Sequence, residues 1–218
     1  MVKKHIVPAI LVKKKSDLVK KLRGAAPYCQ RVQIDIIDGK FANNKTIGPK
    51  SIKGVRTKLK KEIQLMVKDM DKYVDAFIKQ KPWMIIFHIE SCKNKKHVDE
   101  LIKKIKKAKI KAGIGLSPKT PASKVKPFLK KIDLVLVMTV KPGWGGQKFI
   151  KKMLPKIRQL RKWDKKIDIE VDGGIKPGTA CLAAKAGANV FVAGGAIYKA
   201  KSIKSGVQQL KNDVRCMT

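Results

Sequence analysis

The chain has 218 residues, 52 of them Lys or Arg and 16 Asp or Glu, which gives a formal net charge of +36 at pH 7. Hydrophobic residues make up 44% of the chain, an ordinary globular value that excludes intrinsic disorder despite the charge. No apolar run reaches the roughly 18 residues of a membrane-spanning helix, and the first residues lack the apolar stretch of a secretory signal. We therefore expect a globular, cytoplasmic protein.

Short apolar runs recur along the chain, each of a length typical of a buried strand. Most are continuous rather than alternating, which is the pattern of parallel strands that are covered on both faces. The eight runs span residues 6–11, 32–37, 63–67, 84–89, 112–116, 134–140, 167–171 and 190–193.

Polar stretches with helical periodicity lie between these runs. The clearest span residues 71–79, 96–107, 151–161 and 202–214. A further helix is expected to open at Pro121 with Thr120 as its N-cap, because proline favours the first helical position.

Eight strands that alternate with helices predict a (βα)8 TIM barrel, in which each unit takes roughly 27 residues. No linker or change of composition divides the chain, so we expect one domain over residues 1–218. A doubly wound open sheet is the alternative.

The cysteines are widely spaced and form no CxxC motif. Cys29, Cys92, Cys181 and Cys216 therefore predict neither a zinc cluster nor a disulfide framework, and a reducing cytosol is the default compartment.

The positive charge comes mostly from lysine, since only six of the basic residues are arginines. Nucleic-acid recognition favours arginine and a focused basic stripe, whereas these lysines are spread over the whole chain. We interpret them as a solvated surface that binds polyanions non-specifically, and keep a specific nucleic-acid partner as the alternative.

The few acids include several at the ends of predicted strands, where a TIM barrel carries its chemistry. These are Asp35, Asp38, Glu90, Glu170 and Asp172. Carboxylates inside apolar runs are costly to bury without a purpose. We expect Asp35 and Asp172 to face each other across the barrel mouth, where they could remove a proton from one face of a substrate carbon and return it to the other. Asp38 precedes a glycine and is interpreted as a turn residue.

Glycine-rich segments follow the last three predicted strands, where TIM barrels commonly bind phosphate through backbone N–H groups. The candidate phosphate-binding residues are Gly143, Gly145 and Gly146, then Gly173 and Gly174, and finally Gly194 and Gly195.

Several segments together carry a resemblance that extends over nearly the whole chain and follows the order of one family. They are residues 7–11 (VPAIL), 34–41 (IDIIDGKF), 64–67 (QLMV), 87–90 (FHIE), 138–149 (MTVKPGWGGQKF), 170–175 (EVDGGI) and 187–194 (GANVFVAG). On these segments the chain resembles the ribulose-phosphate 3-epimerase family.

The resemblance implies a barrel of the ribulose-phosphate binding type and a place in the pentose phosphate pathway. It implies that D-ribulose 5-phosphate and D-xylulose 5-phosphate interconvert by two-base proton transfer at carbon 3 through an enediolate. Asp35 and Asp172 match the two family aspartates, and Met66 and Met138 match methionines that shield the intermediate. It also implies a homo-oligomer and no organic cofactor.

The chain departs from the family where a metal is expected. The resemblance implies a divalent metal held by Asp35, Asp172 and two histidines, but Gln33 and Gln64 stand at the histidine positions. A glutamine amide oxygen is a weak, hard ligand, so two glutamines and two aspartates could at best bind a hard cation such as Mg²⁺ or Mn²⁺ loosely. A glutamine can also donate N–H groups to an oxyanion. One hypothesis is therefore a metal-poor or metal-independent epimerase in which Gln33 and Gln64 bond the enediolate. His88 matches a family histidine and is interpreted as a supporting or core residue.

The alternatives are a catalytically silent barrel that binds a phosphosugar, and an epimerase of a related ketose phosphate. Barrels of the orotidine-phosphate decarboxylase group place a lysine between their strand-end acids. Residues 35–38 contain none, so we reject that chemistry.

Overall fold

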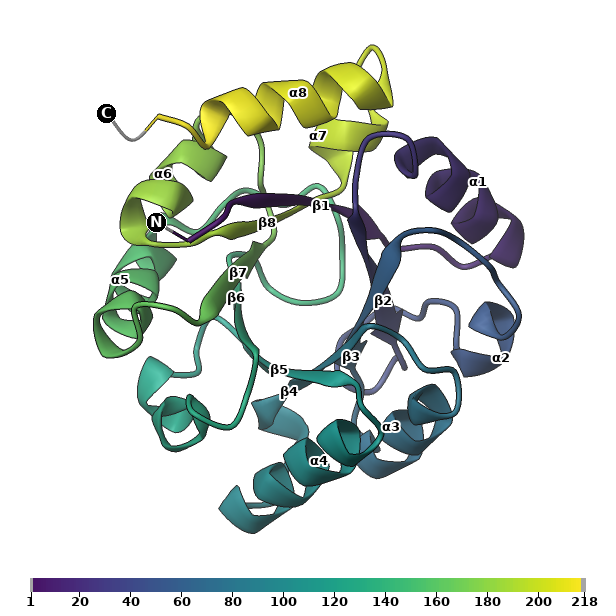
Figure 1. The fold of residues 1–218 in the computed structure, drawn as a ribbon, viewed down its shortest axis with the longest axis vertical. Coiled ribbons are helices and arrows are strands. Elements are labelled where there is room, and N and C mark those ends of the chain that lie inside the picture. Colours follow the sequence, from purple (N-terminus) through teal and green to yellow (C-terminus); the bar gives the residue numbers. More distant parts are fainter. Residues whose placement is uncertain (1, 217–218) are drawn as a thin grey trace.

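The computed structural model describes residues 2–216. Eight parallel strands pair in sequence order and close into one barrel, with the helices outside it (Figure 1). The predicted (βα)8 TIM barrel is confirmed, and the open sheet is excluded because the first strand, His5–Ile10, pairs with the last, Val190–Ala193. The strands are β1 (His5–Ile10), β2 (Arg31–Ile37), β3 (Lys60–Met66), β4 (Met84–His88), β5 (Lys111–Leu116), β6 (Leu134–Met138), β7 (Asp168–Asp172) and β8 (Val190–Ala193).

The helices cover the outside of the barrel and bury their apolar faces against the strands. The four stretches with helical periodicity form helices at Met70–Ile78, Lys95–Lys107, Leu154–Trp163 and Ile203–Asp213. The helices are α1 (Lys15–Ala25), α2 (Pro49–Ile52), α3 (Met70–Ile78), α4 (Lys95–Lys107), α5 (Leu154–Trp163), α6 (Thr179–Ala186), α7 (Gly195–Tyr198) and α8 (Ile203–Asp213).

The prediction that a helix begins at Pro121 is wrong. This segment forms two short 3-10 turns, Ala122–Lys124 and Lys126–Phe128. Pro127 interrupts a continuous helix, because proline lacks an N–H group and disfavours helical backbone at the residue before it. Pro121 itself is the N-cap, so Thr120 does not have the predicted capping role.

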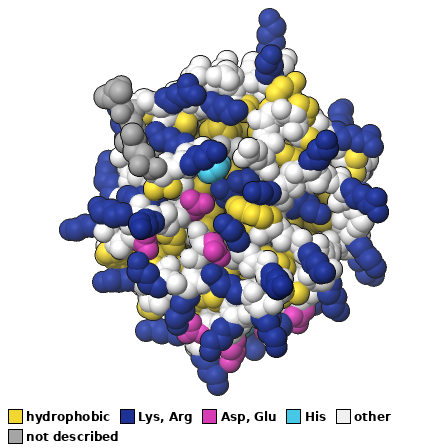
Figure 2. Space-filling view, viewed as in Figure 1, with side chains coloured by type: hydrophobic (Ala, Val, Ile, Leu, Met, Phe, Trp, Pro, Cys, Tyr) yellow, Lys and Arg dark blue, Asp and Glu magenta, His cyan; other side chains and the backbone are white. Residues whose placement is uncertain are grey.

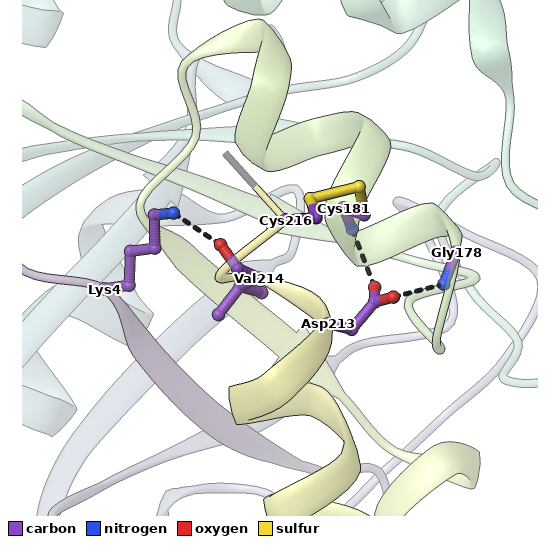
Figure 3. Close-up of a disulfide and its surroundings, with 6 residues drawn as sticks. All are labelled: Lys4, Gly178, Cys181, Asp213, Val214 and Cys216. Atoms are coloured by element: carbon purple, nitrogen blue, oxygen red, sulfur yellow. Dashed lines mark hydrogen bonds between the residues drawn. A yellow bond between two sulfur atoms is a disulfide. The ribbon is translucent and has the colours of Figure 1, made fainter. Parts of the chain in front are cut away.

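The prediction that the cysteines form no disulfides is wrong for one pair. Cys181 of α6 and Cys216 form a disulfide with 5.9 Å between their Cα atoms (Figure 3). Asp213, at the end of α8, accepts hydrogen bonds from the backbone N–H groups of Gly178 and Cys181 at 2.9 and 2.8 Å. These bonds bring the end of α8 against the start of α6, so the pairing depends on a tertiary contact that a separation of 35 residues in sequence does not reveal.

Glu170 lies deeper in the barrel than its predicted place after a strand. It is in the middle of β7, fully buried, and its carboxylate faces the guanidinium of Arg31 at 3.9 Å. Because Arg31 begins β2, this ion pair occupies the N-terminal end of the barrel, away from the strand ends where Asp172 lies.

The positive charge is dispersed over the surface, as the sequence predicted. Figure 2 shows Lys and Arg side chains over all parts of the visible face rather than in one stripe, with Asp and Glu sparse among them. Among residues 2–216, no helix is long and apolar enough to span a bilayer.

Candidate active site

Asp35 and Asp172 meet at the C-terminal end of the barrel interior. Asp35 points inward from β2 and Asp172 ends β7. A single amide nitrogen joins them, because Gln33 Nε2 lies 2.8 Å from Asp35 Oδ1 and 2.9 Å from Asp172 Oδ2. The two carboxyl groups that the sequence placed across the barrel mouth are thus close neighbours.

Gln64 completes a compact cluster of polar atoms with these residues. The end of its amide that faces the aspartates lies 2.7 Å from Gln33 Nε2. That end fits a nitrogen, which donates to Asp35 Oδ1 at 3.0 Å and to Asp172 Oδ2 at 2.9 Å, while the amide oxygen accepts from His88 Nε2 at 3.0 Å. Both glutamines are fully buried, and neither lines the cavity that the two aspartates border. The two amides therefore contact the carboxyl groups and not the cavity. Of these side chains, only the carboxyl groups of Asp35 and Asp172 border the cavity.

The surroundings give the two aspartates unusual proton affinities. Burial, reinforced by the nearby Asp172 carboxylate, raises the pKa of Asp35 well above its usual range. Burial raises the pKa of Asp172 to about 6, against an opposing effect of the Gln33 hydrogen bond. Two close carboxyl groups cannot both ionise easily, so the pair holds a proton more tightly than a free carboxyl group does.

His88 and Glu90 support the cluster from the side of β4. The buried His88 ring places Nε2 3.0 Å from the amide oxygen of Gln64 and Nδ1 3.1 Å from Glu90 Oε2. Glu90 also accepts the backbone N–H of Ser117 at 2.7 Å. Hydrogen bonds from His88 and Ser117 outweigh partial burial and lower the pKa of Glu90 to about 2.

A cavity of about 550 Å³ opens above the two aspartates. It contains every glycine that the sequence predicted for phosphate binding, together with both predicted methionines. The predicted residues that line it are Asp35, Met66, Met138, Gly143, Gly145, Gly146, Asp172, Gly173, Gly174, Gly194 and Gly195. Gln33 and Gln64 are the two predicted site residues that do not line it.

The backbone at Gly173 and Gly174 explains why glycine is required there. Their φ angles are 118° and 66°, in the left-handed region that L side chains rarely adopt. A Cβ on Gly174 would lie 2.6 Å from the backbone nitrogen of Phe149. The β7 loop therefore packs directly on the β6 loop, and this contact shapes the cavity wall.

Four lysines also line the cavity: Lys21, Lys148, Lys176 and Lys199. Lys21 is the least expected of them. It lies on α1, and its Nζ is 4.7 Å from the ring centroid of Tyr198. Burial lowers the pKa of Lys21, while its charge acts to lower the pKa of Asp35. In sequence it resembles the other helix-surface lysines, so no local signal identifies it.

The donor set does not fit a divalent metal such as zinc or iron, which the resemblance implies is held by two histidines and two aspartates. Zinc and iron favour imidazole or thiolate ligands, and the cluster offers two carboxylates and two amides. The Nε2 of Gln33, not its oxygen, faces both carboxylates, while Gln33 Oε1 has no hydrogen-bond partner. Among residues 2–216, no three His, Cys, Asp or Glu side chains are grouped closely enough to hold an ion.

A model of the ribulose-phosphate 3 epimerase family matches residues 5–198 of the chain. A ribulose-phosphate 3-epimerase from Bacillus subtilis is 40% identical over 187 residues, which cover 83% of this chain and 85% of that protein. One from Schizosaccharomyces pombe is 37% identical over 220 residues, covering 98% and 95%. The cytoplasmic isoform from Oryza sativa is 41% identical over 188 residues, covering 84% and 82%.

Solved structures share the fold at low sequence identity. A 3-hexulose-6-phosphate synthase from Salmonella typhimurium superposes with a TM-score of 0.72 at 13% identity, covering 97% of this chain and 98% of that one. An orotidine 5'-monophosphate decarboxylase from Sulfolobus solfataricus gives 0.65 at 14% identity, covering 98% of both chains. At such identity the likeness concerns the barrel alone.

Proposed function

The chain belongs to the ribulose-phosphate 3-epimerase family and is an epimerase, and we propose that it interconverts D-ribulose 5-phosphate and D-xylulose 5-phosphate with Asp35 and Asp172 as its acid and base. The observation that carries this proposal is the pair itself. Two neighbouring carboxyl groups border one cavity, and their surroundings hold a proton on the pair more tightly than on a free carboxyl group. A 3-epimerase needs one base and one acid at the same moment.

The proposed reaction moves one proton in and one proton out. Asp172, ionised, takes the proton from carbon 3, and the electron pair of that C–H bond forms an enediolate over carbons 2 and 3. Asp35, protonated, then gives its proton to the opposite face of carbon 3. The aspartates have exchanged protonation states, and the same steps in reverse convert the product.

We assign Gln33 and Gln64 to the aspartates rather than to the enediolate. The sequence suggested that these amides bond the intermediate directly. Their complete burial and their contacts of 2.7–3.0 Å with the carboxyl groups and each other support a different role. They hold the two carboxyl groups in place, and no step of the proposed reaction passes through a metal.

The rest of the cavity suits an anionic sugar. Backbone N–H groups after β7 and β8, at Gly173, Gly174, Gly194 and Gly195, are the proposed phosphate contacts, and the cavity lysines favour a dianion. Met66 and Met138 form an apolar wall that would keep water from the reactive intermediate.

Other expectations remain proposals of the same kind. We propose a homo-oligomer in the cytoplasm, with salt-sensitive binding of polyanions to the dispersed lysines. Sedimentation at two salt concentrations, with and without added polyphosphate, tests the oligomeric state and the binding of polyanions.

The decisive experiment follows exchange of the carbon-3 proton of D-ribulose 5-phosphate in D2O by NMR. We expect exchange and epimerisation at equal rates with and without a chelator, and loss of both in Asp172→Asn. Phosphosugar binding without exchange would instead identify a silent barrel. Activity that a chelator removes and a metal restores would refute the metal-independent mechanism.

A further inference from the structure

Lys21 reaches the cavity from the middle of a helix that lies on the outside of the barrel. It is on α1, and it lines the same cavity as Asp35 and Gly195. Side chains of an α-helix lean toward the N-terminus of the helix. Because α1 follows β1, its N-terminus lies at the end of the barrel where the strands end. The lean of the helix therefore carries the Lys21 ammonium toward the two aspartates and the glycine loops.

The face of α1 that carries Lys21 packs closely against α7 and α8. Gly24 lies three residues further along, on the same face, and a Cβ there would be 2.6 Å from Ile203 Cδ1 of α8. Lys21 Nζ lies 4.7 Å from the ring centroid of Tyr198, the last residue of α7. The Tyr198 hydroxyl is buried, so its ring face is what supports the ammonium.

The ammonium of Lys21 differs from those of the other cavity lysines. Lys148, Lys176 and Lys199 are exposed, whereas Lys21 is half-buried. Burial lowers the pKa of Lys21, because the ammonium has lost part of its water. The acids whose charges act on it are Asp17 and Asp35, and over residues 2–216 no hydrogen bond or ion pair joins Lys21 Nζ to an acceptor.

Two other half-buried lysines of the chain show what is missing. Lys61 Nζ donates to the backbone oxygen of Val55 at 3.2 Å. Lys156 Nζ donates to the backbone oxygens of Ser117 and Pro118, both at 3.0 Å. An ammonium carries three donors and is costly to strip of water without acceptors. Lys21 has kept the burial and lacks the acceptors, so the cavity beside it is the place where an anion would complete it.

The cavity wall next to Lys21 lacks other side-chain donors at that depth. It is formed by residues that offer only backbone polar groups, namely Ala9, Leu11, Gly194, Gly195 and Ala196. An anion at this wall would therefore meet backbone N–H groups and a single half-buried ammonium. Such an ammonium forms stronger charge-assisted hydrogen bonds than one in open water.

We propose that Lys21 is a substrate-binding residue, whose ammonium contacts the phosphate group of the sugar at the wall formed by Gly194 and Gly195. The inference rests on the proposed phosphosugar substrate, and it names the side chain that favours a phosphorylated ligand. The phosphate is the expected contact, rather than the reacting carbons, because Lys21 shares its wall with two of the proposed phosphate-binding glycines.

The first test is Lys21→Met, which keeps an unbranched stem beside Tyr198 and removes the charge. We expect KM for D-ribulose 5-phosphate to rise about tenfold or more, with kcat within about threefold of the wild type. Lys21→Arg, which keeps a cation, should recover part of the loss. An unchanged KM in Lys21→Met, whatever its kcat, overturns the proposal.

The neighbouring Lys20 provides the matched control. It lies on the same helix, is exposed and does not line the cavity. Lys20→Met removes the same charge from the same helix and should leave kcat and KM unchanged. An equal rise of KM in both variants would show that overall charge, not a contact of Lys21, attracts the substrate, and would overturn the proposal.

The second test measures binding without turnover, by calorimetry with D-ribulose 5-phosphate. We expect Lys21→Met to weaken binding about tenfold or more and Lys20→Met to leave it unchanged. A wild type that binds the phosphosugar through Lys21 but does not epimerise it would refute the proposed function and support this inference. Binding that Lys21→Met does not weaken would refute this inference alone.

The third test uses the wild type and so does not depend on how a variant folds. The lysine amines are labelled by reductive methylation, with and without saturating D-ribulose 5-phosphate, and each site is quantified by mass spectrometry. We expect the phosphosugar to protect Lys21 and to leave the labelling of Lys20 unchanged. Labelling of Lys21 at the same rate with and without bound phosphosugar overturns the proposal.

Discussion

Gln33 donates from its amide nitrogen to Asp172 Oδ2 at 2.9 Å, across 139 positions of sequence. At the position of Gln33 the family resemblance implies a histidine, which would be linked to Asp172 through a metal ion. An N–H donor satisfies a carboxylate without a cation, which is why the buried acids remain together here.

The first prediction is that histidine at both positions creates a metal site. In Gln33→His, Gln64→His the two imidazoles and two carboxylates form a donor set suited to zinc. We expect the double variant to bind about one equivalent of zinc, measured by elemental analysis and calorimetry, and its epimerase activity to become sensitive to chelator. The wild type and each single variant are the controls. Stoichiometric zinc in the purified wild type would contradict the argument.

The second prediction concerns the rate as a function of pH. Asp172 must be ionised to take a proton, and its pKa is raised to about 6. We expect kcat/KM to fall about tenfold per pH unit below that value and to be level just above it. Asp38→Asn is a suitable control, because Asp38 lies in the turn after β2. An acid limb near pH 4 would show that Asp172 is not the base.

The sequence predicted the barrel well because buried parallel strands are continuous apolar runs, and all eight predicted strands are present. It predicted the pairing of Asp35 with Asp172 because strand ends converge in a barrel. It failed where tertiary contacts decide. The Cys181–Cys216 disulfide depends on how α8 ends against α6. Lys21 reaches the cavity from an ordinary lysine-rich helix, which no local pattern distinguishes.

The third prediction compares two positions in the cavity wall, one at which only glycine fits and one at which a larger residue has room. Gly174 has a φ of 66° and no room for a Cβ, whereas Gly145 has nothing within 4 Å of one. Gly174→Ala should destabilise the fold by about 1–3 kcal/mol and raise KM, because strain shifts the contact with Phe149. Gly145→Ala should change the stability of the fold and KM only slightly. Chemical denaturation and steady-state kinetics measure the two effects, and equal effects would contradict the assignment.

The last prediction links the catalytic pair to stability. Burial raises the pKa of Asp172 in the folded protein to about 6, above its unfolded value of 3.8, so the folded state binds the proton more tightly. The resulting stabilisation is complete below about pH 4 and is lost as the pH rises through about 6. At pH 8 the ionised carboxylate therefore costs stability that an amide of the same shape does not. We expect Asp172→Asn to raise the melting temperature at pH 8 by about 3 °C or more and to change it less at pH 4.

Asp99→Asn, on the exposed Asp99–Lys131 pair, should show no such gain. If Asp172→Asn melted lower than the wild type at pH 8, the charged form would have to be favourable in the fold. The pKa of Asp172 would then lie below its ordinary value, which would remove the basis for its role as a base that coexists with a protonated Asp35.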